Sequence, residues 1–419
     1  MKTAIRKRAK AIAWSCTLVY FASYLMRINF AVMLVKICSD MQVNKTDLAI
    51  VVTGLTIAYG TGQIISGLMG DKIKPQLMLT FGLALAAICN VAMFFCSAIP
   101  VMTVVWSING FAHAMLWPPI VRLMSTYLTD DEYGYSAVRV SWGSSFATIL
   151  LYLLCPVLLG FLHWRVIMLV CAAGGIAIMI FWMLVHPRLF TQPMENTRNT
   201  SANGSEKPAY APLPRFVYLP VVLIMLGIIL QGILRDGVTN WMPSYLLETF
   251  GLPEENAIVA TVILAVFSVI SFALFDMLHR KVFQNEVFCS AMIFVMSALS
   301  AGVLYLINLA SASVVISMLL MAIIVSCMHG INLMLITVVP KRFVKSGKVA
   351  TYSGLLNACT YIGASISTYG FAALAESFGW NFTILTWMLV SLAGIAVCLA
   401  ATPLWKRFRR EYVDADVQR

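Results

Sequence analysis

The sequence predicts an all-α membrane protein whose twelve transmembrane helices form two pseudo-symmetric bundles of six. The first observation is composition, because 60% of the 419 residues are hydrophobic and only 11% are charged, far from the balance of a soluble domain. The second is that the apolar residues form about twelve continuous runs, each long enough to cross a bilayer. The third is a polar stretch that divides these runs six and six.

The twelve runs predict helices rather than the strands of a barrel. They are continuously apolar instead of alternating, and in lipid a helix satisfies its backbone groups within its own segment. In chain order, the expected helices cover residues 11–36, 48–70, 77–97, 100–124, 135–162, 164–186, 216–247, 257–278, 286–309, 311–337, 348–375 and 380–402.

A polar stretch between the sixth and seventh runs predicts the division into domains. Residues 187–215 are rich in Pro, Asn, Ser and Thr, which is typical of a flexible linker. We therefore expect an N-terminal six-helix bundle over residues 1–186, a cytoplasmic linker over 187–215 and a C-terminal six-helix bundle over 216–419. Each half carries an arginine in its first helix and an acidic and basic pattern after its second, which predicts two copies of one unit.

Charge placement predicts the orientation. Most of the 29 Lys and Arg residues precede the first run, occupy the even-numbered connections or follow the last run, so both termini should face the cytoplasm of a multi-pass plasma-membrane protein. The net charge of +11 is then a topology signal, and we expect a lipid bilayer rather than a nucleic acid as the partner surface. The basic MKTAIRKRAK before the first run is interpreted as the start of an uncleaved helix.

The sequence gives no positive case for an enzyme. Its ten cysteines are scattered without ligand-like spacing and are interpreted as small core residues rather than as disulfides or a metal site. Walker A, H-E-x-x-H and G-x-S-x-G patterns do not occur. We expect no cofactor, no metal and no catalytic residues.

Two arginines lie deep in apolar runs, and they predict the chemistry of the interior. Arg27, in SYLMRINFAV, is roughly 24 Å of helix rise from the start of its segment, and Arg235 lies at a similar depth. An arginine at the bilayer centre costs about 2.5 to 3.5 kcal/mol on insertion scales, so a matched pair indicates function. Alternatively, each could extend to the outer interface, or Arg235 could pair with Asp236.

The remaining charges near the membrane favour an anionic substrate. Arg122 and Arg139 lie near the ends of their segments, where they are interpreted as interface anchors. Of the 18 acidic residues, only Asp236 is expected well inside a membrane segment, whereas proton-driven transporters usually carry buried acidic or histidine relays. A cationic interior suits an anion, and guanidinium groups match the oxygens of a phosphate or carboxylate.

Several motifs resemble a known family. GLMGDKIKP, with Gly67, Asp71 and Lys72, resembles the loop motif of the major facilitator superfamily, although Lys74 and Pro75 depart from it. YLMRINF, GFAHAMLWPPIVRLM, LRDGVTNWMPSYL and TYSGLLNACTYIGAS are similar to the organophosphate:phosphate antiporter family, which includes glycerol-3-phosphate and hexose-6-phosphate transporters. The string from Met115 to Met124 is the most distinctive, and the chain resembles a divergent member.

The resemblance implies candidate binding residues. The family's two phosphate-binding arginines fall on Arg27 and Arg235, and its tyrosines fall on four positions that could equally be packing residues. Three positions depart from the glycerol-3-phosphate transporter: its lysines fall on Ile28 and Gln63, and its helix-five histidine falls near Ser144. Two membrane histidines either make helix contacts or line the cavity. The candidate substrate-binding residues are Arg27, Arg235, Tyr20, Tyr24, Tyr59, Tyr361, Gln63, Ser144, Asp236, His113 and His329.

The implied mechanism is alternating access, with inorganic phosphate exchanged for a phosphorylated metabolite by a monomer. The candidate latch between conformations comprises Gly67, Asp71 and Lys72, with a weaker counterpart at Asp276 and Arg280; a solvated interface would give the same pattern. Two alternatives remain open. One is a proton- or sodium-coupled symporter of a carboxylate such as a sugar acid. The other is a non-transporting sensor of organophosphates.

Overall fold

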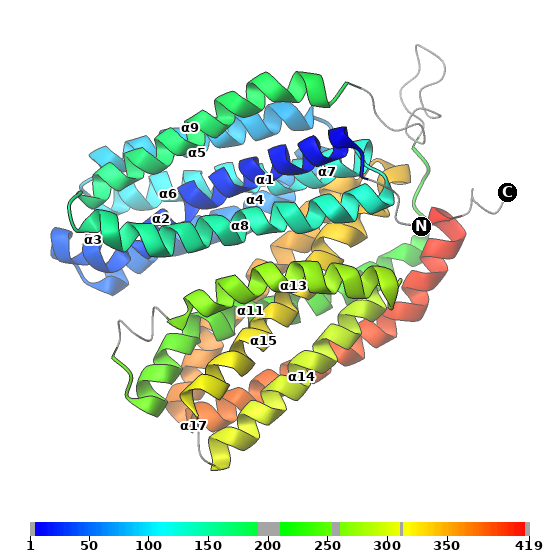
Figure 1. Ribbon diagram of the computed structural model, residues 1–419. Coiled ribbons are helices and arrows are strands. Elements are labelled where there is room, and N and C mark those ends of the chain that lie inside the picture. The colour runs from blue at the N-terminus through cyan, green and yellow to red at the C-terminus, as the bar shows by residue number, and fades with distance from the viewer. Residues whose placement is uncertain (1–4, 192–209, 254–259, 311–312, 415–419) are drawn as a thin grey trace. The chain divides into compact units, whose positions relative to one another are not determined.

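The structure is a computed structural model that describes residues 5–191, 210–253, 260–310 and 313–414. The chain forms two compact units (Figure 1). Unit 1 comprises Met1–Ala211 together with Phe343–Leu355, and unit 2 comprises Pro212–Arg342 and Leu356–Arg419. A short segment from late in the chain therefore belongs to the first unit.

Unit 1 is built from helices that pack lengthwise. α1 packs on α8 and α9, α4 packs on α6, and α5 packs on α6 and α9. α8 begins with a capping box in which the Thr129 hydroxyl accepts from Glu132 N while the Glu132 carboxylate accepts from Thr129 N. The helices are α1 (Lys7–Arg27), α2 (Asn29–Val32), α3 (Leu34–Met41), α4 (Lys45–Gly70), α5 (Pro75–Phe95), α6 (Ile99–Ala114), α7 (Trp117–Tyr127), α8 (Asp130–Leu159) and α9 (Trp164–Leu189).

In unit 2, α15 is the central helix and packs on α11, α13 and α14. It continues as a π-helix over Leu333–Val338 and then as α16 (Val339–Lys341). The other helices are α11 (Tyr218–Phe250), α13 (Val262–Lys281) and α14 (Glu286–Ala310), with α15 itself at Val314–Asn332. α17 (Val349–Phe408) begins in unit 1 and belongs to unit 2 from Leu356 onward.

The helical prediction is confirmed, with differences in how the helices are divided. Ten helices in the described part of the chain are long and apolar enough to cross a membrane. The last of these is interrupted at Gly379, where the backbone leaves the helical conformation with a φ of 77°, so its two parts correspond to the final two predicted segments. The first predicted segment is not one helix but α1, α2 and α3, separated at Ile28 and Met33.

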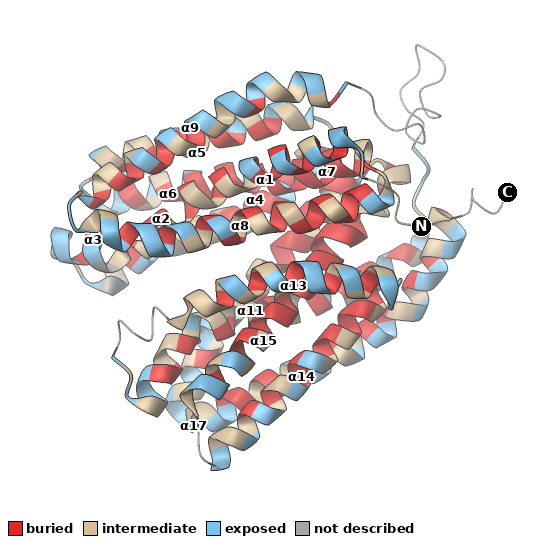
Figure 2. Ribbon diagram, in the orientation of Figure 1, coloured by how far each residue is buried: buried red, intermediate tan, exposed pale blue. Residues whose placement is uncertain are grey.

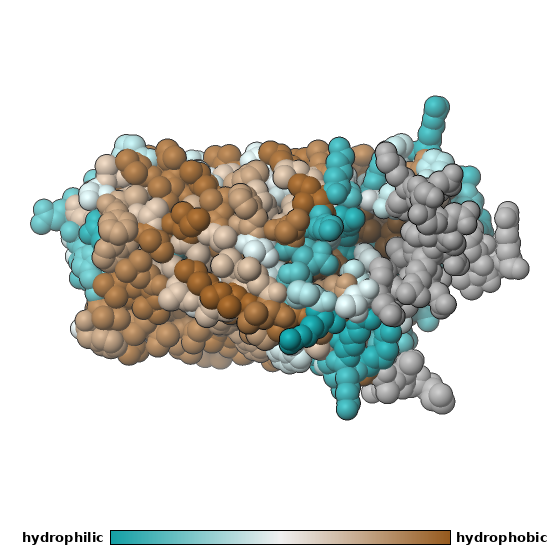
Figure 3. All heavy atoms as spheres, turned by 90° about the horizontal axis from the view of Figure 1, so that it is seen from above, coloured by the Kyte–Doolittle hydropathy of each residue, from teal (hydrophilic) through white to brown (hydrophobic). Residues whose placement is uncertain are grey.

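Apolar side chains cover the outside of the helices as well as filling the interior. Figure 2 shows buried residues on the sides of the helices that face their neighbours in the same unit. On the face drawn in Figure 3, hydrophobic surface forms a broad band with hydrophilic side chains on both sides of it. Phe95 and Phe161 are 75% and 70% exposed, as expected where lipid rather than water is the solvent.

The interpretation of the cysteines as core residues is confirmed. All ten are buried, and none takes part in a disulfide. No group of three or more potential metal-ligating side chains occurs within the described residues.

Candidate functional site

In unit 1, α1 ends at Arg27, and the chain leaves the regular helix at Ile28 before α2 begins at Asn29. The carbonyl oxygen of Met26 accepts hydrogen bonds from the side-chain amides of Asn90 and Asn109, at 2.9 and 3.0 Å. Asn29, the first residue of α2, donates its own amide to Asn90 Oδ1 at 2.7 Å. All three asparagines are fully buried. This buried asparagine cluster satisfies backbone groups that a continuous helix would have satisfied itself, as irregular backbone at membrane depth requires.

The Arg27 side chain lies among aromatic rings. Its guanidinium carbon is 4.1 Å from the centre of the Tyr24 ring and 4.6 Å from that of Tyr59, distances at which a cation is attracted to the ring face. Tyr20 extends this aromatic group, with its ring centre 5.1 Å from that of Tyr24 and 4.9 Å from that of Trp117. Arg27 is 9% exposed. The position at the C-terminal end of α1 also favours a cation electrostatically.

Two further candidate residues in unit 1 are buried polar side chains with unused hydrogen-bonding capacity. Gln63 is one helical turn after Tyr59 on α4 and is fully buried, and neither its amide oxygen nor its amide nitrogen has a partner in the described part of the chain. His113 Nδ1 is 3.1 Å from the hydroxyl of Ser23, one turn before Arg27, while its Nε2 has no hydrogen-bond partner among the residues that the structure describes. Buried polar atoms without protein partners call for an explanation, and a bound ligand or water would supply one.

The remaining candidate of unit 1, Ser144, differs from these. Its hydroxyl donates to the carbonyl oxygen of Ser141 in the same helix at 2.7 Å. The structure therefore brings Arg27, Tyr20, Tyr24 and Tyr59 together through ring contacts, while Ser144 has a local hydrogen bond in α8.

In unit 2, Arg235 and Asp236 form a bidentate ion pair on α11. Arg235 Nε and Nη2 donate to the two carboxylate oxygens of Asp236 at 2.9 and 2.8 Å. The alternative raised by the sequence, in which Arg235 pairs with its neighbour, is thus the arrangement in this structure. The side chains are 16% and 25% exposed, so the pair is accessible to a ligand. An anion that binds Arg235 must compete with this carboxylate or share the guanidinium with it.

The surroundings of Arg235 include a residue that sequence reasoning missed. Gln231, one turn earlier on α11, is fully buried and donates to the carbonyl oxygen of Met328 at 3.1 Å, while its own oxygen has no partner among the described residues. The next residue on α15 is His329, whose ring packs edge-on against Phe272 at 5.4 Å. A polar side chain four residues before Arg235 in an apolar run was the available signal.

Tyr361 lies on α17 and is half-buried. The preceding residue marks a close approach between α17 and α11, since a Cβ at Gly232 would collide with the carbonyl oxygen of Thr360. Tyr361 is therefore placed one residue from the point where the helix that carries Arg235 meets α17.

Asp71, at the end of α4, is hydrogen-bonded to the start of α17. Its carboxylate accepts from the backbone N–H groups of Ala350 and Thr351, at 2.8 and 3.0 Å, and from the Thr351 hydroxyl. Gly67 allows this approach, because a Cβ there would lie 2.8 Å from the Ala350 carbonyl oxygen. Burial raises the pKa of Asp71, while the hydrogen bonds from Thr351 and Ala350 and the charge of Arg122 act in the opposite direction.

Arg122 has a more specific role than the predicted interface anchor. One of its terminal nitrogens, Nη1, donates to the carbonyl oxygen of Gly70, before Asp71, and to that of Ile73, after it, the latter at 2.9 Å. Arg122 therefore fixes the loop that carries Asp71 and Lys72. Arg139 instead lies over the ring of Tyr135, with its guanidinium carbon 3.3 Å from the ring centre.

The predicted counterpart in the second half has a different geometry. Asp276 and Arg280 are one turn apart on α13 and form an ion pair of 2.9 Å along that helix, whereas Asp71 bonds to the start of a second helix. A more deeply buried charge cluster also lies in unit 2: the fully buried Glu286 pairs with Arg342 at 2.6 Å and with Arg409 at 3.2 Å. Sequence reasoning missed this cluster because its members are far apart along the chain.

Comparisons with known proteins agree with this architecture. The model of the Major Facilitator Superfamily matches residues 16–368. The chain is similar to a glycerol-3-phosphate transporter of Bacillus subtilis (strain 168), with 26% identity over 94% of this chain and 92% of the relative. It is also similar to a phosphoglycerate transporter protein of Salmonella typhimurium (strain LT2), with 24% identity over 94% and 88%.

Among solved structures, the chain is similar to the proton:xylose symporter XylE bound to 6-bromo-6-deoxy-D-glucose. The TM-score is 0.74, and the alignment covers 98% of this chain and 97% of the other at 13% sequence identity. This likeness concerns the fold alone.

Proposed function

Since the chain belongs to the Major Facilitator Superfamily, we propose that it is a secondary transporter of a small phosphorylated organic anion. The observation that carries the proposal is the buried guanidinium of Arg27 on the faces of Tyr24 and Tyr59. The relatives named for glycerol 3-phosphate and phosphoglycerate transport support the substrate class. The chain is a transporter and not an enzyme.

Arg27 would bind the phosphate group of the substrate. A guanidinium presents a planar fork of N–H donors that matches two phosphate oxygens, and such charge-assisted hydrogen bonds are stronger away from water. The rings of Tyr24 and Tyr59 and the buried asparagine cluster at the break in α1 hold the group in place. Little conformational freedom would then be lost on binding.

Arg235 would supply the second cation through exchange of partners. In this structure its bidentate partner is Asp236, which neutralises the guanidinium in the absence of substrate. We propose that a phosphate group displaces Asp236 from at least one of these two hydrogen bonds. The returning carboxylate would then assist release of the anion.

The uncharged polar residues of unit 1 would bind the organic part of the substrate. Gln63 falls on a position where the glycerol-3-phosphate transporter that the sequence resembles has a lysine. Neither the oxygen nor the nitrogen of its amide has a hydrogen-bond partner in the described part of the chain. Nε2 of His113 is likewise available. An amide and an imidazole are suited to hydroxyl groups, so a hydroxylated metabolite phosphate fits better than inorganic phosphate alone.

Transport would occur by alternating access, with inorganic phosphate as the exchanged anion and with a monomer as the transporting unit. The contact of Asp71 with Ala350 and Thr351 would stabilise one conformation and break in the other. The distribution of Lys and Arg supports an orientation with both termini in the cytoplasm.

Counterflow in reconstituted vesicles tests this proposal. Vesicles loaded with inorganic phosphate should take up labelled glycerol 3-phosphate, hexose 6-phosphate or 3-phosphoglycerate without a proton or sodium gradient. Arg27→Lys should be impaired, and Arg188→Lys, at an exposed arginine, should act like the wild type. Uptake that depends on either gradient would refute exchange. Uptake of a sugar acid in preference to every phosphate ester would instead support the carboxylate symporter.

A further inference from the structure

A cavity of about 580 Å³ lies at one end of unit 1, away from Arg27. It is bounded by the loop after α4, the first turn of α5 and the last turns of α7 and α9. Four membrane-spanning helices begin or end here, at Gly70, Pro75, Tyr127 and Leu189. The cavity therefore lies at the level where a bilayer changes from hydrocarbon to headgroups. The positive-charge distribution predicts that this is the cytoplasmic end.

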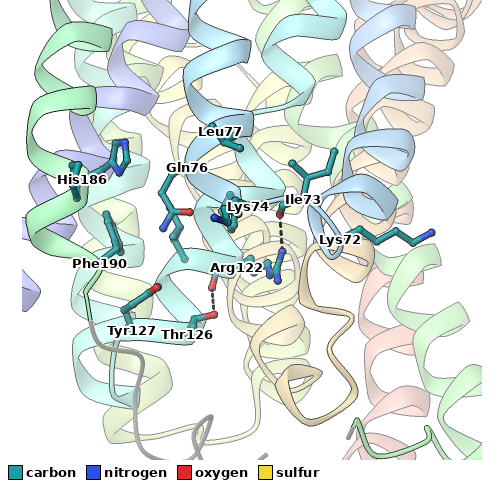
Figure 4. Close-up of a pocket in the computed structure, with 13 residues that line it drawn as sticks. Lys72, Ile73, Lys74, Gln76, Leu77, Arg122, Thr126, Tyr127, His186 and Phe190 are labelled. Atoms are coloured by element: carbon teal, nitrogen blue, oxygen red, sulfur yellow. Dashed lines mark hydrogen bonds between the residues drawn. The ribbon is translucent and has the colours of Figure 1, made fainter. Parts of the chain in front are cut away.

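The lining of the cavity is cationic. Its 13 residues include Lys72, Lys74 and Arg122, and none of them is acidic. Figure 4 shows Lys74 and Arg122 between the loop and the wall formed by α9, with His186 on that wall, while the Lys72 side chain extends away from His186. Arg122 is half-buried and Lys74 is exposed, so Arg122 and Lys74 are permanent charges that line the cavity, and the exposed Lys72 adds charge at the rim.

The cations stand on a fixed backbone rather than on a mobile loop. The N–H groups of Lys72 and Ile73 both donate to the carbonyl oxygen of Met69, at 3.0 and 2.8 Å. Arg122 is held by its hydrogen bonds to Gly70 and Ile73, so it cannot swing away from the cavity without breaking them. A site that is already ordered loses less conformational entropy when it binds a ligand.

The other part of the lining is apolar and aromatic. It includes Leu77, Leu123, Pro187 and the rings of Tyr127 and Phe190, whose centres are 5.1 Å apart in an edge-on arrangement. Leu77 is 62% exposed, so the apolar wall continues onto the outer surface. A ligand that fits both walls carries an anionic group next to a hydrophobic one.

We propose that this cavity binds the phosphate group of an anionic phosphate-bearing ligand, and that Lys74 and Arg122 hold the charge. Two sources share this chemistry: the headgroup of an anionic membrane phospholipid, and free inorganic phosphate. Basic pockets at the ends of membrane helices are suited to the first. This site is separate from the proposed transport site, because it does not involve Arg27 or Arg235.

The test compares ligand binding to the purified full-length protein and to matched lysine variants. Native mass spectrometry would count bound phosphatidylglycerol and bound phosphatidylcholine, and thermal shift would measure stabilisation by each lipid and by inorganic phosphate. Lys74→Gln removes one cation of the lining, and Gln76→Glu adds an acid to it. Lys10→Gln is the control, because Lys10 is an exposed lysine at the same end of unit 1 and is not part of the lining.

The wild type and Lys10→Gln should bind phosphatidylglycerol in preference to phosphatidylcholine, and Lys74→Gln should bind it about fivefold more weakly. Gln76→Glu should weaken it in the same direction. A second outcome would support the same site with free phosphate as its ligand. In that case inorganic phosphate stabilises Lys10→Gln but not Lys74→Gln, and the wild type shows no preference for either lipid. If inorganic phosphate bound only at the transport site, it would stabilise Lys74→Gln and Lys10→Gln to the same extent. Equal binding of every probe by the wild type, Lys74→Gln and Gln76→Glu would overturn the proposal.

Discussion

At the scale of single residues, the identity of Arg27 follows from its contacts. A lysine could supply the charge, but it lacks the planar group that stacks on the rings of Tyr24 and Tyr59 and the fork that matches two phosphate oxygens. The depth of Arg27 in an apolar run was sufficient to single it out from the sequence. The residues that hold it were not predicted, because asparagines in apolar runs do not reveal which backbone carbonyl they will bind.

The buried asparagine cluster should control both stability and binding. Asn90→Leu removes two donors and the acceptor for Asn29, and leaving such buried groups unsatisfied costs about 1 to 3 kcal/mol. The melting temperature should fall, and phosphate-ester affinity should fall with it because the end of α1 is no longer fixed. Thr61→Val, at an exposed threonine whose hydroxyl donates to carbonyl oxygens of its own helix, is the control. An Asn90→Leu protein with wild-type affinity would show that the cluster does not position Arg27.

Asp236 should act as a competitor of the substrate. Asp236→Asn removes the carboxylate that occupies Arg235, so phosphate-ester affinity should rise, by roughly fivefold if the partly exposed pair contributes about 1 kcal/mol. Turnover should slow, because the carboxylate no longer returns to displace the anion. Isothermal titration and initial rates of counterflow measure the two quantities. A loss of affinity in Asp236→Asn would mean that Asp236 supports binding instead.

At the scale of helices, hydropathy predicted where the chain crosses the membrane but not where helices break. The predicted run over residues 11–36 is divided at Ile28 and Met33, and neither position carries the Gly or Pro that usually marks a break. The break is stabilised by amides of α5 and α6, so it depends on tertiary contacts. The turn at Gly379 was correctly expected as a boundary, since a short gap separates two predicted segments there.

The contact between the end of α4 and the start of α17 should govern the rate of transport rather than substrate affinity. Asp71→Asn replaces an acceptor of three hydrogen bonds with an amide that can accept at only one oxygen. Gly67→Val should disturb the same contact sterically. In both variants we expect the maximal rate of counterflow to fall while the dissociation constant stays close to that of the wild type.

Asp47→Asn is the matched control for the α4 contact, because Asp47 lies at the opposite end of α4 and caps the helix through the N–H of Asn44. It should leave both quantities unchanged. A selective loss of affinity in Asp71→Asn, at an unchanged maximal rate, would assign Asp71 to substrate binding instead of to the conformational change.

At the scale of the whole molecule, composition and the spacing of apolar runs were sufficient for the fold. The all-α membrane architecture follows from the requirement that lipid-embedded backbone be hydrogen-bonded within its own segment. Long-range charge clusters could not be predicted, because Glu286, Arg342 and Arg409 come together only through packing. The assignment of Phe343–Leu355 to unit 1 also depends on contacts that a linear pattern does not contain. The predicted limits of the two bundles stay a prediction.

The central claim is that the buried guanidinium of Arg27 binds the phosphate group of the substrate. Its most direct test is isothermal titration of a phosphate ester, chosen by the counterflow assay, into wild type, Arg27→Lys and the exposed control Arg188→Lys. Loss of the charge-assisted fork should weaken binding to Arg27→Lys by roughly tenfold or more, while Arg188→Lys binds like the wild type. Equal affinity of Arg27→Lys and wild type would contradict the account.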